Sequence, residues 1–451
     1  MSEYKEIYAP YIMSTVKAIP NLTYEERADC LKKAGYNIFK VKPKDIAFDL
    51  FTDSGNSSVS NMQSSSYLLG DDAPITMGES YERLINTISK IFGYQFISLF
   101  TQGRAAEQSF NQFIINKDDH ILGNMTFSTS QHHQISSGGI PVSVSSCNNL
   151  EDTNIFKGNI DLDKCSHFLK TKKVAYINIE MCSNALGGYP ISLDNLKQVY
   201  ELADVYNIPL ILDGTRILEN AKFIQMYEKG YEEKLIHEII TEICNYSHGC
   251  VMSFKKDFLT KNGGMAGLRD EVLFRKVSDF NLVSGQEITG SDQEVLLQGI
   301  KEAIYNENHM TYRFNQTIRL YNILLNKGVP VLKPHSGHGV WINLDNISFE
   351  KTNITNIQLS FQNLLYLKKG IRVGAETPKI NGSTTKLIRL AIPHRLFVES
   401  HIDYIGESVA EVINSEQHWI DYIQSTDAKV EGIIENLLCD YEPKLVNEVT
   451  Q

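Results

Sequence analysis

The chain has 451 residues, of which 42% are hydrophobic and 22% charged, so it can bury a large core and divide into more than one domain. Its formal net charge of -11 excludes non-specific binding to nucleic acids or anionic membranes, because both need a basic surface. No eighteen apolar residues run together, and the seven cysteines form no CxxC pair. We therefore expect a cytoplasmic protein without a membrane span, disulfides or a zinc site, whose partner is a small molecule.

The first 55 residues are expected to form an arm that contributes to a smaller domain. They hold an amphipathic segment over residues 24–34 and the strand-like run IAFDLFTDSG. The serine-rich stretch SGNSSVSNMQSSS lies between apolar runs, which favours an active-site loop and a helix start over a linker.

Residues 56–300 alternate between predicted helices and strands. A helix over residues 81–92 precedes the strand FISLF, and the strands ILGNMTFSTS, IPVSVSS and VAYINIEM follow. Helices over residues 193–206 and 232–246 carry their apolar residues on one face. This alternation predicts a large α/β domain built on a mostly parallel sheet.

Residues 301–451 are expected to form a smaller α+β domain. A long helix over residues 291–325 would lead into it, followed by strands at VPVLKP, GVWINLD and KLIRLAI and helices over residues 357–369 and 401–423. Arg389 lies in the apolar strand KLIRLAI, where a buried guanidinium needs a carboxylate partner. That partner is either another residue of the chain or the carboxylate of a substrate.

Two candidate catalytic groups lie where predicted strands end. The run IPLILDGTR contains a predicted buried strand that ends at Asp213. A second predicted strand, over residues 250–253, is followed by Lys255 and Lys256. The carboxyl ends of parallel strands meet at the edge where open α/β sheets bind ligands. An Asp that pairs with a ring nitrogen and a Lys that forms a Schiff base are the groups that pyridoxal phosphate (PLP) requires. A helix cap and solvated lysines are the ordinary alternative.

The segment TQGRAAEQ changes from strand to helix at Gln102, Gly103 and Arg104. A glycine at such a turn lets backbone N–H groups approach a phosphate, and the helix dipole favours the anion. The same segment is also compatible with an ordinary turn. The cofactor hypothesis favours the phosphate cradle.

Motifs along nearly the whole chain resemble one family. Taken in order, FDLFTDSG, GDDA, FGYQ, QGRAAEQ, GNMTFSTS, NALGGYPIS, DGTRILENAKFI, MSFKKD, IRLAIPHR and YEPK look like the tryptophanase and tyrosine phenol-lyase family, with spacing somewhat closer to the phenol-lyases. The resemblance implies an α/β, fold-type I PLP-dependent enzyme, with a large, mostly parallel-sheet domain and a smaller α+β domain. It also implies a homo-oligomer, a dimer or a tetramer.

The resemblance assigns roles to individual residues. Lys256 matches the Schiff-base lysine and Asp213 the partner of the pyridine nitrogen. The other cofactor contacts fall on Gln102, Gly103, Arg104 and Ser253 for the phosphate, Phe127 for the ring face, and Asn184 and Arg216 for the cofactor's oxygen. Substrate contacts fall on Thr52, Ser54, Asn184 and Arg389, and a monovalent cation such as potassium on Gly55, Asp72 and Lys261.

The chain departs from the family on the substrate side. Pro74 or Ile75 stands where the family has a tyrosine that protonates the departing ring, and Glu376 stands where phenol-lyases read the phenol hydroxyl with an arginine. Glu448 and Val449 replace two phenylalanines. The cofactor half is therefore expected to persist while the side-chain pocket is rebuilt.

Glu376 is a candidate catalytic residue in that rebuilt pocket. It would pair with the substrate's side chain or act as an acid or base, and an ordinary loop carboxylate is the alternative. His338 matches a family histidine near the substrate, although a core or surface position is favoured for it.

The expected activity is α-proton abstraction from a polar, non-aromatic L-amino acid, followed by β-elimination or β-replacement through a quinonoid. The alternative is another PLP reaction, namely transamination, decarboxylation, racemisation or retro-aldol cleavage. A catalytically silent homologue is disfavoured, because the lysine, the aspartate and the arginine are all present.

Overall fold

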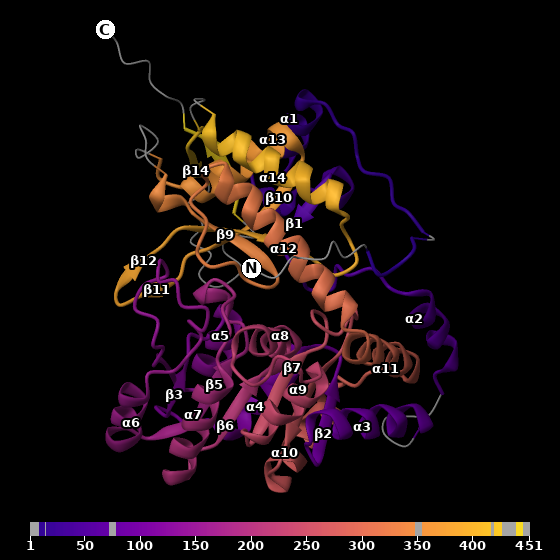
Figure 1. The fold of residues 1–451 in the computed structure, drawn as a ribbon, viewed down its shortest axis with the longest axis vertical. Helices are drawn as coiled ribbons and strands as arrows, with labels where there is room; N and C mark the ends of the chain where they lie inside the picture. The colour runs from indigo at the N-terminus through magenta and orange to yellow at the C-terminus, as the bar shows by residue number, and fades with distance from the viewer. Residues whose placement is uncertain are drawn as a thin grey trace. The chain divides into compact units, whose positions relative to one another are not determined.

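A computed structural model of the chain describes residues 9–13, 15–71, 78–347, 354–415, 419–425 and 439–444. The chain divides into two compact units. The larger unit comprises residues 53–314 and 393–396, and the smaller comprises residues 1–52, 315–392 and 397–451. Figure 1 shows the course of the chain by residue number.

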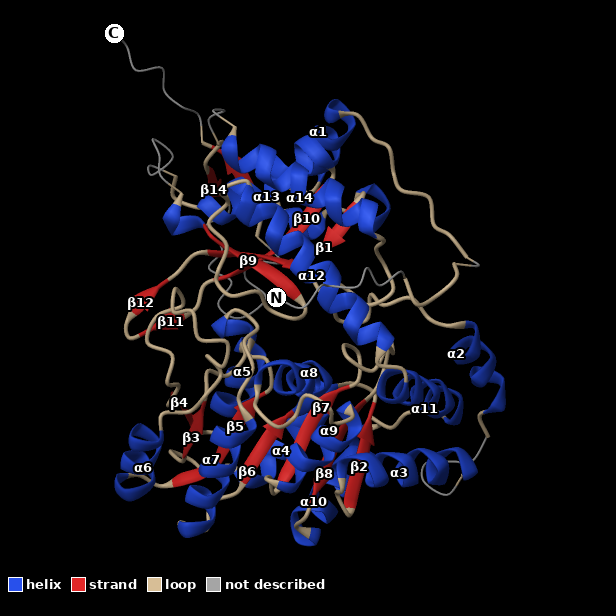
Figure 2. Ribbon diagram, in the orientation of Figure 1, coloured by secondary structure: helices blue, strands red, loops and turns tan. Residues whose placement is uncertain are grey.

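The larger unit is built on a seven-stranded sheet, drawn in red in Figure 2. In spatial order its strands are β2 (Phe96–Phe100), β8 (Gly264–Leu268), β7 (Gly249–Ser253), β6 (Leu210–Asp213), β5 (Val174–Glu180), β3 (His120–Gly123) and β4 (Ile140–Ser143). Strands β3 to β7 run parallel, and β8 is antiparallel to both of its neighbours. This confirms the predicted α/β class with a mostly parallel sheet.

Helices cover this sheet on both faces. The helices of the larger unit are α2 (Asn61–Ser66), α3 (Glu79–Phe92), α4 (Gly103–Ile114), α5 (Ser128–Ser136), α6 (Leu162–Thr171), α7 (Leu193–Val205), α8 (Ile217–Tyr227), α9 (Ile236–Asn245), α10 (Glu271–Ser284) and α11 (Gly290–Tyr305). In β6, Leu210 and Leu212 join one hydrophobic cluster and Ile211 joins the other, because strand side chains alternate between faces. Burial on both faces explains why these strands read as continuous apolar runs.

The smaller unit has a four-stranded sheet in the order β1 (Phe48–Leu50), β10 (Ile371–Glu376), β13 (Leu387–Ala391) and β9 (Gly339–Asn343). Strand β1 from the N-terminal segment runs parallel to β10, and the other pairs are antiparallel. Its helices include α1 (Tyr24–Lys33), α13 (Ile357–Lys369) and α14 (Glu399–Asn414). Short antiparallel pairs join β11 (Lys379–Ile380) to β12 (Ser383–Thr384) and β14 (Tyr422–Gln424) to β15 (Tyr441–Pro443).

Four predicted elements differ from the structure. The strand expected over ILGNMTFSTS ends at Gly123, and its last three residues, 128–130, begin helix α5. The helix expected over residues 291–325 is two helices, α11 and α12 (Asn308–Asn326), because Asn306 leaves the helical conformation at φ -122° and ψ 79°. The helix expected over residues 401–423 ends at Asn414, where Ser415 is extended. The run VPVLKP forms only an isolated bridge from Val331 to Ile342, since Pro330 has no N–H for a ladder.

Within the described residues, no helix is long and apolar enough to cross a membrane.

Candidate functional site

The carboxyl ends of three parallel strands gather the predicted cofactor residues in the larger unit. In the sheet register, Glu180 of β5 lies beside Asp213 of β6, and Asp213 lies beside Val251 of β7. Strand β7 ends at Ser253, and the turn after it carries Lys255 and Lys256. Parallel pairing thus brings Asp213 and the two lysines to one edge of the sheet.

The two lysines have different surroundings. The Lys256 amine lies 5.9 Å from the centroid of the Phe127 ring. Burial and the nearby Arg216 lower the pKa of Lys256 to about 8, against the opposing effect of Asp53, Asp213 and Glu180. Burial and Arg104 also lower the pKa of Lys255. Lys256 is therefore the lysine on which the carboxyl groups of Asp53, Asp213 and Glu180 act.

The predicted phosphate cradle is a close contact between a helix start and a strand end. A Cβ on Gly103, the first residue of α4, would lie 2.6 Å from the Ser253 Cβ and 2.8 Å from the Ser253 backbone nitrogen. Gln102 forms a bridge with Gly263, and a Cβ on Gly264 would lie 2.4 Å from the Gly103 nitrogen. Only glycine fits such an approach, which leaves the first N–H groups of a 12-residue helix next to Ser253.

Hydrogen bonds hold the ends of β6 and β7 together. The Asp213 Oδ1 accepts from the Thr215 N–H at 3.1 Å, and the Thr215 hydroxyl oxygen accepts from the Ser253 N–H at 3.1 Å. The carboxylate of Asp213 is therefore fixed relative to the strand that delivers the lysines.

A buried ion pair lies beside this edge. The Arg216 Nη2 donates to Asp53 Oδ1 at 3.0 Å and to Asp53 Oδ2 at 3.1 Å, and both side chains are almost fully buried. Asp53 lies between Thr52 and Ser54, the two predicted hydroxyl positions, and the sequence reasoning missed it. Its signal was its place in the motif FDLFTDSG, where any of the polar residues could face the site.

Glu180 was also missed. It is buried, its Oε1 accepts from the Asn184 N–H at 3.1 Å, and its Oε2 has no hydrogen-bond partner among the described residues. Burial and the neighbouring Asp213 raise the pKa of Glu180 to about 8. An acid in the apolar run VAYINIEM was a signal that could have identified it. Glu180 is thus a second carboxyl beside Asp213, at the end of β5 and hydrogen-bonded to the backbone of Asn184.

Arg389 and Glu376 belong to the smaller unit, together with Thr52. The Arg389 Nη1 lies 3.1 Å from the Glu376 Oε1, so an internal carboxylate partner, one of the two alternatives for Arg389, is present in the fold. His338 is fully buried and packs edge-on against Trp341, with ring centroids 5.0 Å apart, which agrees with a core histidine.

The residues named for a monovalent cation are only partly described. A Cβ on Gly55 would lie 3.9 Å from the Lys261 carbonyl oxygen, so these two backbones are near each other. Asp72 lies outside the described residues, as do Pro74, Ile75, Glu448 and Val449. Within the described ranges, no group of three or more His, Cys, Asp or Glu side chains could hold a metal ion.

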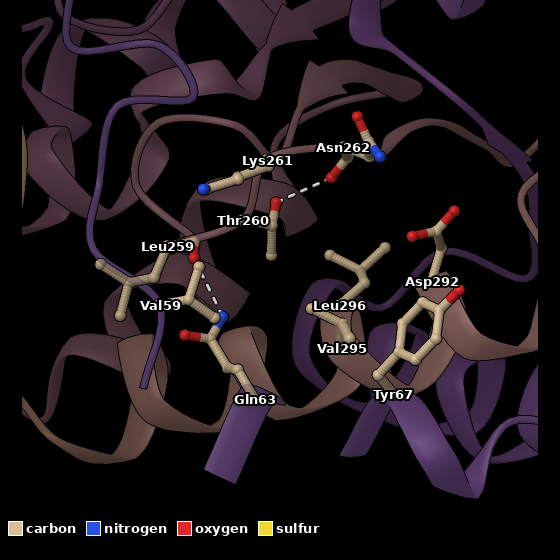
Figure 3. Close-up of a pocket in the computed structure, with 10 residues that line it drawn as sticks. All are labelled: Val59, Gln63, Tyr67, Leu259, Thr260, Lys261, Asn262, Asp292, Val295 and Leu296. Carbon is tan, nitrogen blue, oxygen red and sulfur yellow. Dashed lines mark hydrogen bonds between the residues drawn. The ribbon is translucent and has the colours of Figure 1, made fainter. Parts of the chain in front are cut away.

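A separate cavity of about 200 Å³ lies beside α2 and α11 (Figure 3). Two of its lining residues are joined by a hydrogen bond, which Gln63 Nε2 donates to the Leu259 carbonyl oxygen at 2.9 Å. Lys261 reaches it, whereas Lys256, Asp213 and Gly103 do not line it. Its lining residues are Val59, Gln63, Tyr67, Leu259, Thr260, Lys261, Asn262, Asp292, Val295 and Leu296.

The residues at the sheet edge fit pyridoxal phosphate. A glycine cradle at a helix start suits a phosphate, a lysine with lowered pKa suits an aldehyde, and a carboxylate at a strand end suits a protonated ring nitrogen. The fold agrees. A solved structure titled as Bna3p, a putative kynurenine aminotransferase from Saccharomyces cerevisiae, matches with a TM-score of 0.64 at 14% identity, over 88% of this chain and 99% of that chain. The fold is that of the fold-type I PLP enzymes.

The sequence comparisons narrow this class. Residues 49–408 match the family model described as beta-eliminating lyase. A tyrosine phenol-lyase from Nostoc punctiforme is 35% identical over 431 residues, covering 90% of this chain and 91% of that protein. One from Symbiobacterium thermophilum is 32% identical over 423 residues, covering 89% of this chain and 91% of that protein. The chain belongs to the beta-eliminating lyase family and is a PLP-dependent lyase, as its motifs predicted.

Proposed function

We propose that this lyase eliminates or replaces the β-substituent of a polar, non-aromatic L-amino acid. The observation that carries the proposal is the Lys256 amine, with its pKa lowered to about 8 beside Asp213 and Phe127. A lysine that is partly neutral at physiological pH can hold an aldehyde cofactor and later take a proton.

The larger unit supplies the residues that would hold the cofactor. Lys256 would carry it, Asp213 would pair with its ring nitrogen, and Phe127 would lie against its ring. Gln102, Gly103, Arg104 and Ser253 would hold its phosphate, with Asn184 and Arg216 near its remaining oxygen. When bound, PLP withdraws electrons from the substrate's α-carbon and so acidifies the α-proton.

The chain's own groups would then move protons. The Lys256 Nζ takes the α-proton, and loss of the β-substituent with its bonding electrons requires a proton at the leaving group. Elimination followed by hydrolysis gives pyruvate and ammonia from a substrate with an unbranched β-carbon. Thr52, Ser54, Asn184 and Arg389 would orient the amino acid.

The proposed substrate class rests on Glu376. In the resemblance this residue stands where phenol-lyases carry an arginine for the phenol hydroxyl, and an ionised carboxylate has neither the positive charge nor the N–H donors of that arginine. A substrate side chain with a positive charge or a hydrogen-bond donor suits Glu376 better. The Nostoc and Symbiobacterium relatives are named tyrosine phenol-lyases, so tyrosine is the comparison substrate. We expect this protein to turn tyrosine over poorly.

A second candidate is a PLP enzyme that breaks a different bond. It is favoured by Pro74 or Ile75 at the position of the family's general-acid tyrosine. Without that acid, transamination, decarboxylation, racemisation or retro-aldol cleavage competes with elimination. Release of pyruvate separates the two candidates.

The proposal also includes a homo-oligomer, a dimer or a tetramer, in the cytoplasm and a potassium ion at Gly55, Asp72 and Lys261. Replacing potassium by tetramethylammonium would reduce cofactor affinity if these residues bind the ion.

The test is an absorbance spectrum of the purified protein before and after a panel of L-amino acids, coupled to pyruvate detection. We expect a cofactor band that Lys256→Ala loses and Lys255→Ala keeps. A polar amino acid that changes the band and yields pyruvate supports the proposal. A changed band without pyruvate supports the second candidate, and a band that Lys256→Ala retains would contradict the assignment of the lysine.

A further inference from the structure

Arg389 lies in the middle of the smaller unit's sheet. Its neighbours in β13, Ile388 and Leu390, are fully buried, and the register pairs Arg389 with Trp341 of β9 and Gly374 of β10. Directly opposed residues of antiparallel strands share a face, so Trp341 and Gly374 lie on the same face as Arg389. A guanidinium in such surroundings needs partners to offset its lost hydration.

Glu376 reaches Arg389 from the end of the neighbouring strand. It is two residues beyond Gly374 in β10, and strand side chains repeat every second residue, so it lies on the face that carries Arg389. The pair is 3.1 Å apart, with 9% of the Arg389 side chain and 23% of the Glu376 side chain exposed. This is a largely desolvated ion pair rather than a surface contact.

The guanidinium has further donors on the same face. Its Nη2 donates to the Phe51 carbonyl oxygen at 3.0 Å, and its Nε is buried without a partner among the described residues. A Cβ on Gly374 would lie 3.4 Å from that Nε, so a side chain at this position would crowd this edge of the guanidinium. Glu376 is thus the one carboxylate recorded on Arg389 within the described residues.

The backbone of Glu376 is fixed, while its side chain is at a strand end. Gln358 Nε2 donates at 2.8 Å to the carbonyl oxygens of both Glu376 and Leu387, which are register partners. The carboxylate can therefore leave Arg389 by rotation about its own side-chain bonds without moving β10.

We propose that Glu376 is an internal ligand of Arg389, which the carboxylate of an incoming amino acid must displace. This inference rests on the proposed function, which assigns Arg389 to the substrate's carboxylate. A guanidinium grips a carboxylate through two parallel N–H groups, so a ligand that uses Nη1 competes directly with Glu376. The displaced Glu376 carboxylate then becomes available to the substrate's side chain.

The displacement has a consequence for specificity. Every amino acid must overcome the same internal ion pair, and a substrate whose side chain pairs with the released Glu376 recovers part of that loss. A substrate with an apolar or anionic side chain recovers none. Glu376 therefore acts as a specificity-determining residue before any bond is broken.

The test measures binding to the PLP-loaded protein with probes that cannot undergo elimination. L-alanine carries a carboxylate and an amino group, propionate carries only the carboxylate, and L-alanine methyl ester lacks the carboxylate. The variants are Glu376→Gln, Glu376→Asp and Arg389→Gln. Dissociation constants come from the cofactor spectrum for the two amines and from calorimetry for propionate.

Asp49→Asn is the matched control. Asp49 pairs with Arg372 of the same strand β10 at 2.6 Å, and the side-chain exposures, 10% for Arg372 and 27% for Asp49, are close to those of the Arg389 pair. It tests whether loss of any largely buried ion pair in this sheet alters binding.

We expect Glu376→Gln to bind L-alanine and propionate about tenfold more tightly, with the methyl ester unchanged, because only carboxylates compete with Glu376. Glu376→Asp, one methylene shorter, should lie between wild type and Glu376→Gln, and it also serves if Glu376→Gln folds poorly. Asp49→Asn should bind all three probes as wild type does.

Unchanged or weaker binding of propionate by Glu376→Gln would overturn the inference. If Arg389→Gln also bound propionate and L-alanine as wild type does, the assignment of Arg389 to the substrate's carboxylate would fail together with the inference. A cofactor band retained by these variants would leave the proposed lyase function standing. Loss of the cofactor band from the wild-type protein would instead refute the function itself.

Discussion

Lys255 and Lys256 are adjacent in sequence, but nearby carboxyl groups act on the pKa of Lys256, whereas burial and Arg104 lower the pKa of Lys255. Burial and Arg216 hold the pKa of Lys256 at about 8, below its ordinary value of 10.5, while Asp53, Asp213 and Glu180 oppose that shift. Only the neutral amine attacks an aldehyde, so the proportion of reactive Lys256 rises as the pH passes through its folded-state pKa.

We expect the rate of PLP capture by cofactor-free protein to increase about fivefold between pH 7 and pH 8 and to level off above that range. Stopped-flow absorbance measures this rate. Lys255→Ala should keep the same profile. A midpoint near pH 10 would show that Lys256 is solvated and contradict the environment described here.

Glu180 makes the free energy of unfolding depend on pH, and its contribution decreases as the pH rises. Burial and Asp213 raise its pKa from 4.5 to about 8, so the folded chain binds this proton more tightly than the unfolded chain does. The contribution of this proton is fully present below about pH 4.5 and is lost as the pH rises towards 8.

Glu180→Gln removes this titration while keeping the shape of the side chain. The free energy of unfolding of the variant, relative to wild type, should therefore increase by on the order of 1.4 kcal/mol per pH unit between about pH 5 and 8. Denaturant titrations of cofactor-free protein at several pH values test it. A flat difference for Glu180→Gln would mean that Glu180 is ionised in the fold.

At the scale of elements, the first turn of α4 touches the end of β7 too closely for a side chain at Gly103. Gly103→Ala puts a methyl group 2.6 Å from the Ser253 Cβ, which pushes the helix start away from the strand end. We expect cofactor affinity to fall at least tenfold and the free energy of unfolding to drop by about 1–3 kcal/mol.

The control is Gly230→Ala, whose site has φ +91° and open space around the added Cβ. It should cost about 1 kcal/mol of stability through its backbone conformation and leave cofactor affinity unchanged. Equal losses of affinity in the two variants would mean that the Gly103 contact has no special part in holding the phosphate.

The sequence predicted the strands that carry candidate catalytic residues at their ends better than it predicted which residues these side chains contact. The apolar runs before Asp213 and Ser253 identified buried strands, because a strand covered on both faces is apolar throughout. The pairing of Glu180 with Asp213 depends on strand register, which a single sequence does not specify. The same holds for Arg389 and Glu376. Each was identified separately, while their ion pair depends on the register of β10 against β13.

At the scale of the whole molecule, the candidate residues divide between two units with separate cores. The larger unit holds the lysine, the aspartate and the glycine cradle, and the smaller holds Arg389 and Glu376. The alternation of helices and strands predicted the larger sheet, since each βα step is local in sequence. The break between α11 and α12 falls on the polar run NENH at residues 306–309, which interrupts the apolar pattern and which the predicted single helix over residues 291–325 did not take into account.

Both tryptophans of the chain, Trp341 and Trp419, lie in the smaller unit, and Trp341 faces Arg389 across the β13 and β9 register. Indole emission responds to nearby charge, and Trp341 is buried with only 2% of its surface exposed. The protein therefore carries an intrinsic optical reporter beside the arginine. Its fluorescence can follow the exchange of one carboxylate for another there without any added label.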